Sequence, residues 1–354
     1  MKTITEKVER HKAFWKRDPV SRALLGFVVG GWSAYRGNPG WFPLQNREEL
    51  TAGDVVPEGF VPWIEQHLAQ MDDLEDDAIR PAQPFQAIPW LEAVVGCPLR
   101  SSSEHIWSEP FLSGPPGASP FDLEEIRENP WTLKYLEFLD VLAERFRDER
   151  PVGQSILRGP SDLASACMGE ERFVYSLVDE PEAAKAFLEH LSELERAFFQ
   201  AQWEHTPRFQ GGMVIGEFNL WAPRRAFRFQ EDASALLSPD SYREFVLPWD
   251  EMLCELTEYN VMHLHTTSLH LLDVILEMKS LGALQISQDE GVPLERVLPD
   301  LVRIQEAKKP LIVKGQFTEA EVGDLCERLS PKGLFIQPVV RDVGRAEHLL
   351  MSVR

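Results

Sequence analysis

The stretch Asn260-Val261-Met262-His263-Leu264-His265-Thr266-Thr267-Ser268 decides the fold, because it joins an apolar strand to a polar loop. Successive side chains of a β-strand alternate between its two faces, so His263 and His265 project from the same side, about 7 Å apart. Polar threonine and serine residues follow at once, and a helix-like apolar run begins at Leu269. A strand that ends in this way is typical of an α/β barrel, which carries its chemistry where its strands open into loops.

The histidine pair has two interpretations. A single buried imidazole is more often a core residue that is satisfied by neighbouring backbone groups. Two imidazoles on one face at the end of a strand favour a functional site. We therefore take His263 and His265 as the first candidates for metal binding or acid–base chemistry.

The rest of the chain alternates between helices and strands. Downstream of the histidine strand, apolar periodicity predicts helices over 269–279, 293–306, 318–329 and 343–351. Between them it predicts short strands over 283–286, 311–314 and 334–337. Upstream, strands are predicted over 24–29, 83–86, 153–157 and 212–216, whereas the polar extended piece 224–232 is not counted.

This alternation predicts parallel strands in a (β/α)8 barrel with long loop insertions in the N-terminal half. A doubly wound open sheet is the alternative. No linker or shift in composition divides the chain, so we expect residues 1–354 to form one domain. No Gly-x-Gly-x-x-Gly follows a strand and no Walker loop is present, which argues against a dinucleotide or P-loop site.

Composition excludes further classes of protein. Lys and Arg number 36 against 57 Asp and Glu, which gives a formal net charge of −21. Nucleic acid and anionic membranes attract clustered positive charge, so we expect this chain to bind neither. The N-terminus lacks the apolar core of a signal peptide, and no run approaches the ~20 apolar residues of a membrane span. Four cysteines without a paired motif form no disulfide framework, and we expect a cytoplasmic protein.

Polar residues gather where the predicted strands end, which is where a barrel places its catalytic groups. In chain order they are Trp32, Arg36, Gln86, Arg158, Glu217, Asn219, His263, His265, Thr266, Ser287, Asp289, Lys314, Gln316 and Gln337. Each one alone is equally well explained as a solvated rim residue. The set as a whole is strongly polar, and we expect it to surround one site.

Two neutral imidazoles on one face are good ligands for zinc, which keeps an open fourth position when three protein ligands hold it for catalysis. Glu217, at the end of a predicted strand, is the candidate for the third ligand or, alternatively, for a general base beside a bound water. Asp232 and Glu231 either cap the following loop or reach into the barrel mouth. No cysteine lies at a predicted strand end, so such a site would use nitrogen and oxygen ligands.

Two longer motifs resemble the uroporphyrinogen decarboxylase family. One is Arg158-Gly159-Pro160-Ser161-Asp162-Leu163-Ala164, followed by Gly169 and Pro181-Glu182. The other leads from Asp232-Ala233-Ser234 into Leu237-Ser238-Pro239-Asp240-Ser241-Tyr242-Arg243-Glu244-Phe245-Val246-Leu247-Pro248-Trp249. In that family a similar aspartate precedes a Ser-Pro-x-x-Tyr-x-x-Phe-x-x-Pro-Tyr run and then a strand with His-x-Cys-Gly, which corresponds here to His263-Leu264-His265-Thr266. The resemblance covers most of residues 150–350.

The resemblance implies a (β/α)8 barrel with one of two activities. One branch decarboxylates the acetate arms of uroporphyrinogen without a cofactor. It holds the substrate carboxylates through an Arg-Gln-Ala-Gly-Arg-Tyr motif, where this chain reads Gly30-Gly31-Trp32-Ser33-Ala34-Tyr35-Arg36 with a single arginine. Its essential aspartate has no counterpart in Gln83-Pro84-Phe85-Gln86-Ala87. A polycarboxylate needs an array of charged donors, so we predict no release of carbon dioxide from uroporphyrinogen.

The other branch comprises zinc methyltransferases that move methyl groups between corrinoid proteins and thiols. Their zinc ligands are a His, which matches His263, a Cys, which falls on His265, and a second Cys, which falls near Gln337. Imidazole and amide in place of thiolates would leave the metal a stronger Lewis acid, suited to an oxygen-bearing substrate or to activating water. The alternative is that the metal is lost and the histidines act as acid and base.

Our leading hypothesis is a methyltransferase-like enzyme with zinc at His263, His265 and Glu217, and with Asp232 and Asp289 in the catalytic set. The aromatic loop of Trp32, Tyr35 and Trp41 is expected to wall off an apolar methyl donor or aromatic substrate. The residues expected to bind the substrate are Trp32, Tyr35, Arg36, Arg158, Asn219, Lys314 and Gln337. A corrinoid partner protein is implied by the resemblance alone. The alternatives are decarboxylation of another carboxylated substrate, anchored by Arg36 and Arg158, and an inactive barrel that binds a ligand. The oligomeric state is open, with a homodimer as the default expectation.

Overall fold

The computed structural model describes residues 2–30, 37–116, 125–147 and 149–352. At its centre, parallel strands pair edge to edge in the order β1, β11, β10, β9, β8 and β7. In that order they span Leu24–Leu25, Leu334–Val340, Leu311–Gly315, Ala283–Ser287, Asn260–His265 and Phe227–Gln230. β2 (Val28–Val29) pairs with the far end of β11. The regular alternation expected downstream of the histidine strand is confirmed.

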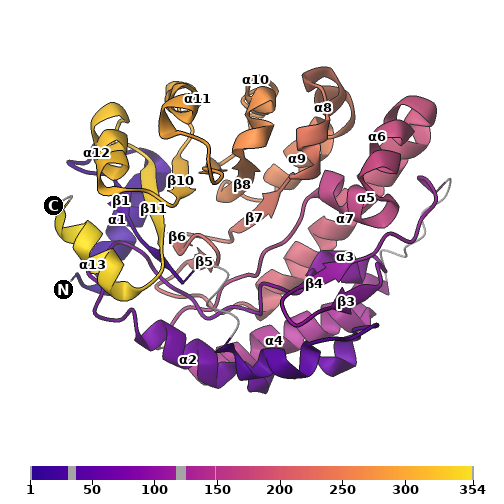
Figure 1. Cartoon of the computed structure of the whole chain (residues 1–354), viewed down its shortest axis with the longest axis horizontal. Coiled ribbons are helices and arrows are strands. Elements are labelled where there is room, and N and C mark those ends of the chain that lie inside the picture. Colours follow the sequence, from indigo (N-terminus) through magenta and orange to yellow (C-terminus); the bar gives the residue numbers. More distant parts are fainter. Residues whose placement is uncertain (1, 31–36, 117–124, 148, 353–354) are drawn as a thin grey trace.

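Sparser pairing completes the wall of the barrel. The backbone N–H of Ala82 donates to Pro151 O at 2.9 Å and its carbonyl accepts from Gly153 at 2.8 Å, which aligns these two segments in parallel. Gly159 N then donates to Gln230 O at 2.7 Å, which brings the second segment against β7. The strands therefore close into a (β/α)8 barrel, as the sequence predicts, and not into an open sheet (Figure 1).

The prediction of the strand before the histidine strand was wrong. Residues 212–216 do contain a strand, β5 (Met213–Ile215), which forms one parallel bridge to Gly153. It pairs antiparallel with β6 (Leu220–Ala222) in a hairpin, however, and not with the histidine strand. The barrel strand is β7, the polar piece that was not counted, and it pairs in parallel with β8. Its Arg228 is completely buried and forms an ion pair with Glu217. Polar side chains of this strand face the barrel interior, so its hydropathy pattern looks like that of a loop.

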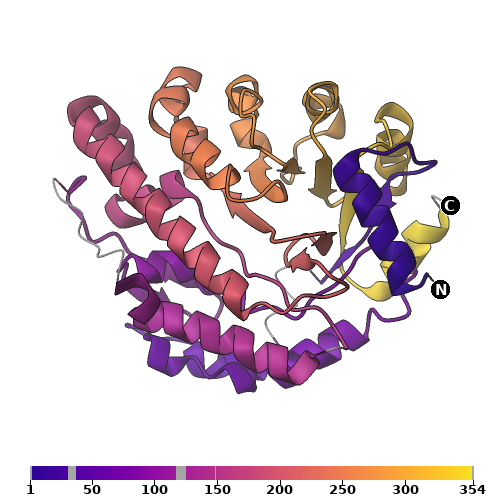
Figure 2. The same ribbon diagram turned by 180° about the vertical axis from the view of Figure 1, so that it is seen from behind.

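The β5–β6 hairpin fills the barrel from its amino-terminal end. Leu220 packs with Val261 and Phe335 in an apolar cluster inside the strands. Helix α1 (Ile4–Lys16) lies against β6, because Trp15 Nε1 donates to Trp221 O at 2.9 Å (Figure 2). The turn of the hairpin points the other way, toward the carboxyl ends of the strands, where Glu217 and Asn219 line a cavity.

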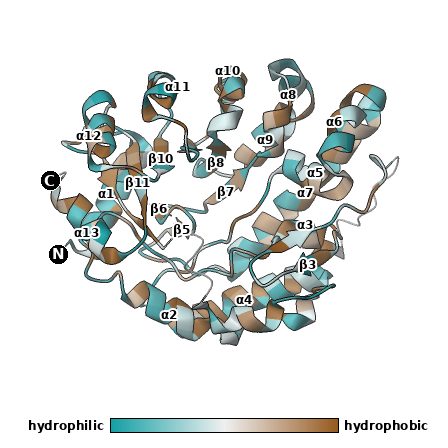
Figure 3. Ribbon diagram, viewed as in Figure 1, coloured by the Kyte–Doolittle hydropathy of each residue, from teal (hydrophilic) through white to brown (hydrophobic). Residues whose placement is uncertain are grey.

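Helices surround the strands on the outside of the barrel, with their apolar sides turned toward the core (Figure 3). In chain order they are α2 (Val61–Ala69), α3 (Trp90–Val94), α4 (Pro130–Phe146), α5 (Pro160–Met168), α6 (Glu170–Asp179), α7 (Pro181–His205), α8 (Pro239–Phe245), α9 (Leu247–Cys254), α10 (Leu272–Ile275), α11 (Leu294–Glu306), α12 (Glu319–Arg328) and α13 (Val343–Ser352). Short 3-10 helices, among them η2 (Pro39–Leu44), and the hairpin of β3 (Leu99–Ser101) and β4 (Ile106–Ser108) occupy the long N-terminal insertions. Within the described ranges, no helix is long and apolar enough to cross a membrane.

A buried carboxylate fastens α1 to the first strand. Asp77 is completely buried and forms ion pairs with Lys2 at 2.7 Å, Arg10 at 2.8 Å and Arg22 at 2.9 Å. It also accepts a hydrogen bond from Leu25 N at 3.0 Å. Burial by itself would raise the pKa of Asp77, but the surrounding cations and the Leu25 amide hold that pKa well below its usual range.

Candidate functional site

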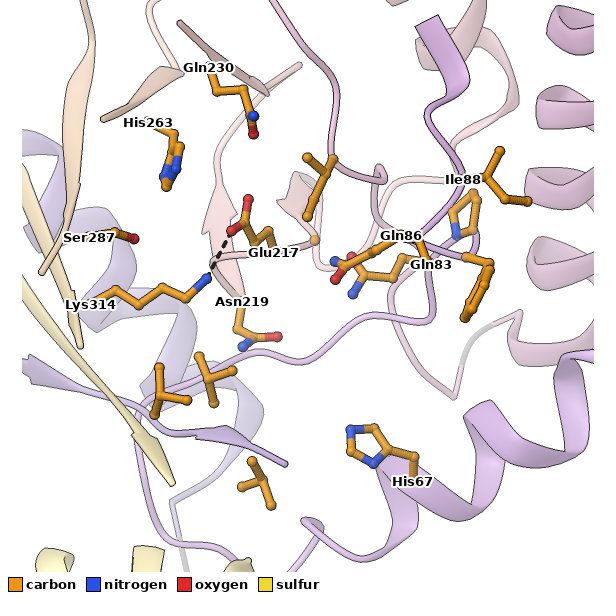
Figure 4. Close-up of a pocket in the computed structure, with 18 of the residues that line it drawn as sticks. His67, Gln83, Gln86, Ile88, Glu217, Asn219, Gln230, His263, Ser287 and Lys314 are labelled. Carbon is orange, nitrogen blue, oxygen red and sulfur yellow. Dashed lines mark hydrogen bonds and ion pairs between the residues drawn. The ribbon is translucent and has the colours of Figure 1, made fainter. Parts of the chain in front are cut away.

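A cavity of about 870 Å³ lies at the carboxyl ends of the strands. It is the expected position for the site of a barrel of this kind. The polar residues that reach it from strand ends and from the β5–β6 turn include Glu217, Asn219, Gln230, Asp232, His263, His265, Ser287, Asp289 and Lys314. Figure 4 shows six of them around the cavity, namely Glu217, Asn219, Gln230, His263, Ser287 and Lys314. Most of the described residues that the sequence places at strand ends therefore line one side of a single cavity.

His263 and His265 lie on the same face of β8, as the strand periodicity predicts. Their ring centroids are 4.9 Å apart and their planes are nearly perpendicular, at 88°. Asp232, which follows β7, completes a cluster whose ligand atoms all lie within 4.8 Å of one another. Three ligand atoms grouped in this way could hold one small cation.

Asp232 and the preceding Glu231 point in opposite directions. Glu231 is completely buried and accepts a hydrogen bond from Ser161 N at 3.1 Å, so it belongs to the core. Asp232 faces the cavity, where its Oδ2 accepts from Gln230 Nε2 at 2.7 Å. Its Oδ1 is buried and has no hydrogen-bond partner among the described residues, and it lies 3.9 Å from His263 Nε2. The structure thus favours the barrel-mouth position for Asp232 and the structural role for Glu231.

A hydrogen-bond acceptor holds the Nδ1 side of each imidazole. His263 Nδ1 is hydrogen-bonded to the side-chain oxygen of Gln285, which lies directly opposite on β9. His265 Nδ1 is hydrogen-bonded to the carboxylate of Asp289, just after the same strand. With Nδ1–H donated in this way, each Nε2 is free to present a lone pair to the cavity.

The buried histidine is held in its neutral form. Burial lowers the pKa of His263 to about 3, and the nearby Arg228 and His265 act in the same direction, although Glu217 opposes them. A neutral imidazole is the form that binds a metal ion. His263 is therefore ready to act as a ligand throughout the physiological pH range.

Glu217 lies outside the cluster of potential metal ligands. One oxygen lies 2.9 Å from Lys314 Nζ and the other lies 2.7 Å from Arg228 Nη2 (Figure 4). Burial would raise the pKa of Glu217, but Arg228 and Lys314 hold that pKa far below its usual range. Glu217 is thus the counter-ion of two cations, and Asp232 occupies the position beside the histidines for which Glu217 was the candidate.

The other expected contact residues divide into three groups. Arg158, Asn219 and Lys314 line the cavity, and so does Trp41. Gln337 does not line it, because its side chain is completely buried and donates to the backbone oxygen of Phe218 in the hairpin turn. Trp32, Tyr35 and Arg36 lie outside the described residues.

Sequence reasoning missed several residues of the site. Gln285 was not among the predicted site residues, because it lies inside an apolar strand. A single glutamine within that apolar run was the available signal, and the structure places it opposite His263. The apolar side of the cavity was also missed, apart from Trp41. It includes Trp63, whose ring stacks on that of His67 at 4.8 Å, and Figure 4 shows His67 facing the cavity from α2, away from His263.

Comparison with known proteins gives two results. The family model of uroporphyrinogen decarboxylase (URO-D) matches residues 85–318. A solved structure of a methyltransferase from Methanosarcina mazei superposes with a TM-score of 0.68 over 97% of both chains, at 14% sequence identity. A similarity at this level of identity supports the barrel fold. No curated protein sequence matches this chain.

Proposed function

The chain belongs to the uroporphyrinogen decarboxylase family, and on that premise we propose that it is a zinc-dependent, methyltransferase-like enzyme. The metal ligands in this proposal are Asp232, His263 and His265. The observation that carries the proposal is the buried Asp232 Oδ1, which lies beside the imidazoles of His263 and His265 and has no hydrogen-bond partner in the described part of the chain. A buried carboxylate oxygen without a partner is costly unless a cation completes it.

The residues present fit zinc. Two imidazole nitrogens and one carboxylate oxygen form a ligand set of the kind that catalytic zinc sites use, and they leave a position open for substrate. Gln285 and Asp289 act as the outer hydrogen-bond acceptors that usually orient zinc-bound histidines. The set differs from the His and two Cys of the methyltransferase branch. In this proposal Asp232, which follows β7, supplies the third ligand.

Zinc at this position would supply a Lewis acid that polarises the atom from which a methyl group leaves or to which it is transferred. The chain itself would bind and orient the substrate. Lys314, whose side chain is one-fifth exposed, offers N–H donors at the floor of the cavity while Glu217 holds it in place. Trp41 and Trp63 would shield the apolar part of the substrate from water. By family likeness, a corrinoid on a partner protein would carry the methyl group.

Decarboxylation finds no support in the geometry. Arg158, one of the two expected anchors, lies 2.6 Å from Glu92, 3.1 Å from Asp162 and 3.8 Å from Asp232, so its charge is already balanced. The lining residues that follow Ala82, from Gln83 to Ile88, include no acid.

Metal analysis of the purified protein tests the proposal. We expect about one zinc per chain in the wild type and a large loss in His263→Ala, His265→Ala and Asp232→Asn. His67→Ala is the matched control, because His67 lines the same cavity but is not part of the cluster. A wild-type protein without zinc, or full zinc occupancy in both cluster-histidine variants, would contradict the proposal. Zinc-dependent transfer of the methyl group from methylcobalamin to an added thiol, which gives the methyl thioether and cob(I)alamin and is followed by the absorption spectrum of the corrinoid, then tests the reaction.

A further inference from the structure

We infer that the substrate of this cavity is a neutral or singly cationic molecule with a flat apolar body. Its apolar body would lie against the aromatic side of the cavity, and its reactive group would face the Asp232–His263–His265 cluster. The position of the reactive group rests on the proposed function. The charge and shape of the substrate follow from the cavity itself.

Each basic side chain that lines the cavity within the described ranges already has a carboxylate partner. Arg80 is hydrogen-bonded to both oxygens of Asp76, which is completely buried. Lys314 lies 2.9 Å from Glu217. Arg158, the third, is shared by the three carboxylates described above. An anionic substrate would therefore have to compete with buried or half-buried carboxylates for every one of these cations.

Among the described residues that line the cavity, acidic side chains outnumber basic ones. Arg80, Arg158 and Lys314 stand against six carboxylates, those of Glu92, Glu104, Glu217, Asp232, Asp289 and Glu290. Glu104 and Glu290 are exposed, and the partner of Glu104 is His105, 3.9 Å away. A divalent ion at the cluster would reduce the excess of three negative charges to one. The field inside the cavity then still favours a neutral or cationic molecule over an anionic one.

The side of the cavity away from the cluster is apolar and aromatic. Trp41, Leu68, Met71 and Phe85 line it, and Trp63 presents a ring that is stacked on His67 at an interplanar angle of 5°. Flat rings of this kind provide a surface for another flat ring, and their faces attract cations. Burial, assisted by Arg80, lowers the pKa of His67, so this imidazole adds no positive charge to the wall.

Three small probes of similar size test the charge preference: benzyltrimethylammonium, benzyl alcohol and phenylacetate. Their binding is measured by saturation-transfer NMR and by tryptophan fluorescence, in zinc-loaded and in zinc-stripped protein. We expect the cation and the neutral probe to bind at least tenfold more tightly than phenylacetate in the stripped protein, where no metal can hold a carboxylate. The double variant Glu104→Gln/Glu290→Gln should weaken binding of the cation several-fold and leave the neutral probe unchanged.

A pair of tryptophan variants tests the place of binding. Trp63→Leu should weaken both favoured probes at least fivefold, whereas Trp107→Leu, on the exposed hairpin strand β4 and outside the cavity lining, should have no effect. Equal or tighter binding of phenylacetate to the stripped protein would overturn the inference. So would unchanged binding in Trp63→Leu, or no binding of any probe at millimolar concentration. A protein that shows the charge preference but holds no zinc would contradict the proposed function and leave this inference standing.

Discussion

Asp289 is hydrogen-bonded through one carboxylate oxygen to His265 Nδ1, and its other oxygen accepts from the backbone N–H and the hydroxyl of Thr266. The residue that follows the histidine strand is thus tied to the same carboxylate as the histidine itself. This arrangement fixes the ring orientation and the tautomer of His265, because a carboxylate accepts hydrogen bonds and donates none.

Asp289→Asn should lower zinc affinity by roughly 10- to 100-fold, the usual effect of losing an outer partner of a metal-bound histidine. The asparagine amide has a single oxygen to accept hydrogen bonds, whereas the two oxygens of Asp289 contact both His265 and Thr266. Competition with a chromophoric chelator measures the change. Asp179→Asn is the matched control, since it makes the same change at an exposed carboxylate that does not line the cavity. Equal zinc affinity in both variants would show that Asp289 does not orient a ligand.

Gln285→Leu should weaken zinc binding about tenfold and also destabilise the fold. The variant leaves His263 Nδ1 without its acceptor in a fully buried position, at a cost of about 1–3 kcal/mol. Chelator competition and urea unfolding of the zinc-free protein separate the two effects. If zinc binding is unchanged while stability falls, Gln285 has a structural role only.

Glu217→Gln should destabilise the protein by about 3–5 kcal/mol while it keeps its zinc. The substitution leaves Arg228, whose side chain is completely buried, without its counter-ion. Urea unfolding gives the stability, and metal analysis of the folded variant gives the zinc content. Loss of zinc from a variant that is still folded would return Glu217 to the list of ligands.

Asp77 should make the protein sensitive to acid. Its pKa is lower in the folded state than in the unfolded chain, so its ion pairs stabilise the protein above the usual carboxyl pKa of about 4. This stability is lost as the pH falls below that value toward the folded-state pKa. In Asp77→Asn, the unfolding free energy should be at least about 2 kcal/mol lower at pH 7, with a smaller difference at pH 3. Parallel unfolding curves for the two proteins across this range would contradict the assignment.

The strands that follow the histidine strand could be predicted because each is apolar and short, and is bounded by helices with clear periodicity. The common face of His263 and His265 follows from the geometry of one strand. The belt of polar strand-end residues could be predicted for the same reason, since carboxyl ends of parallel strands gather at one end of a barrel. Gln337 was misplaced because β11 runs on to Val340, so Gln337 lies inside the strand, where its side chain donates to the backbone oxygen of Phe218 in the hairpin turn.

Local patterns by themselves therefore determined the alternation of helices and parallel strands, the strand end that carries the site and the two imidazoles. The tertiary structure decided that the strands close into a barrel and which carboxylate joins those imidazoles. Hydropathy marks 212–216 as a strand and β7 as a loop, because it cannot register that Arg228 has a buried partner far away in the sequence. β7 pairs with β8 in a register that sets Gln230 beside His263, and this register places Asp232 next to the two histidines. Glu217 instead forms ion pairs with Arg228 and Lys314. A register between two strands is a long-range property, and no single stretch of sequence contains it.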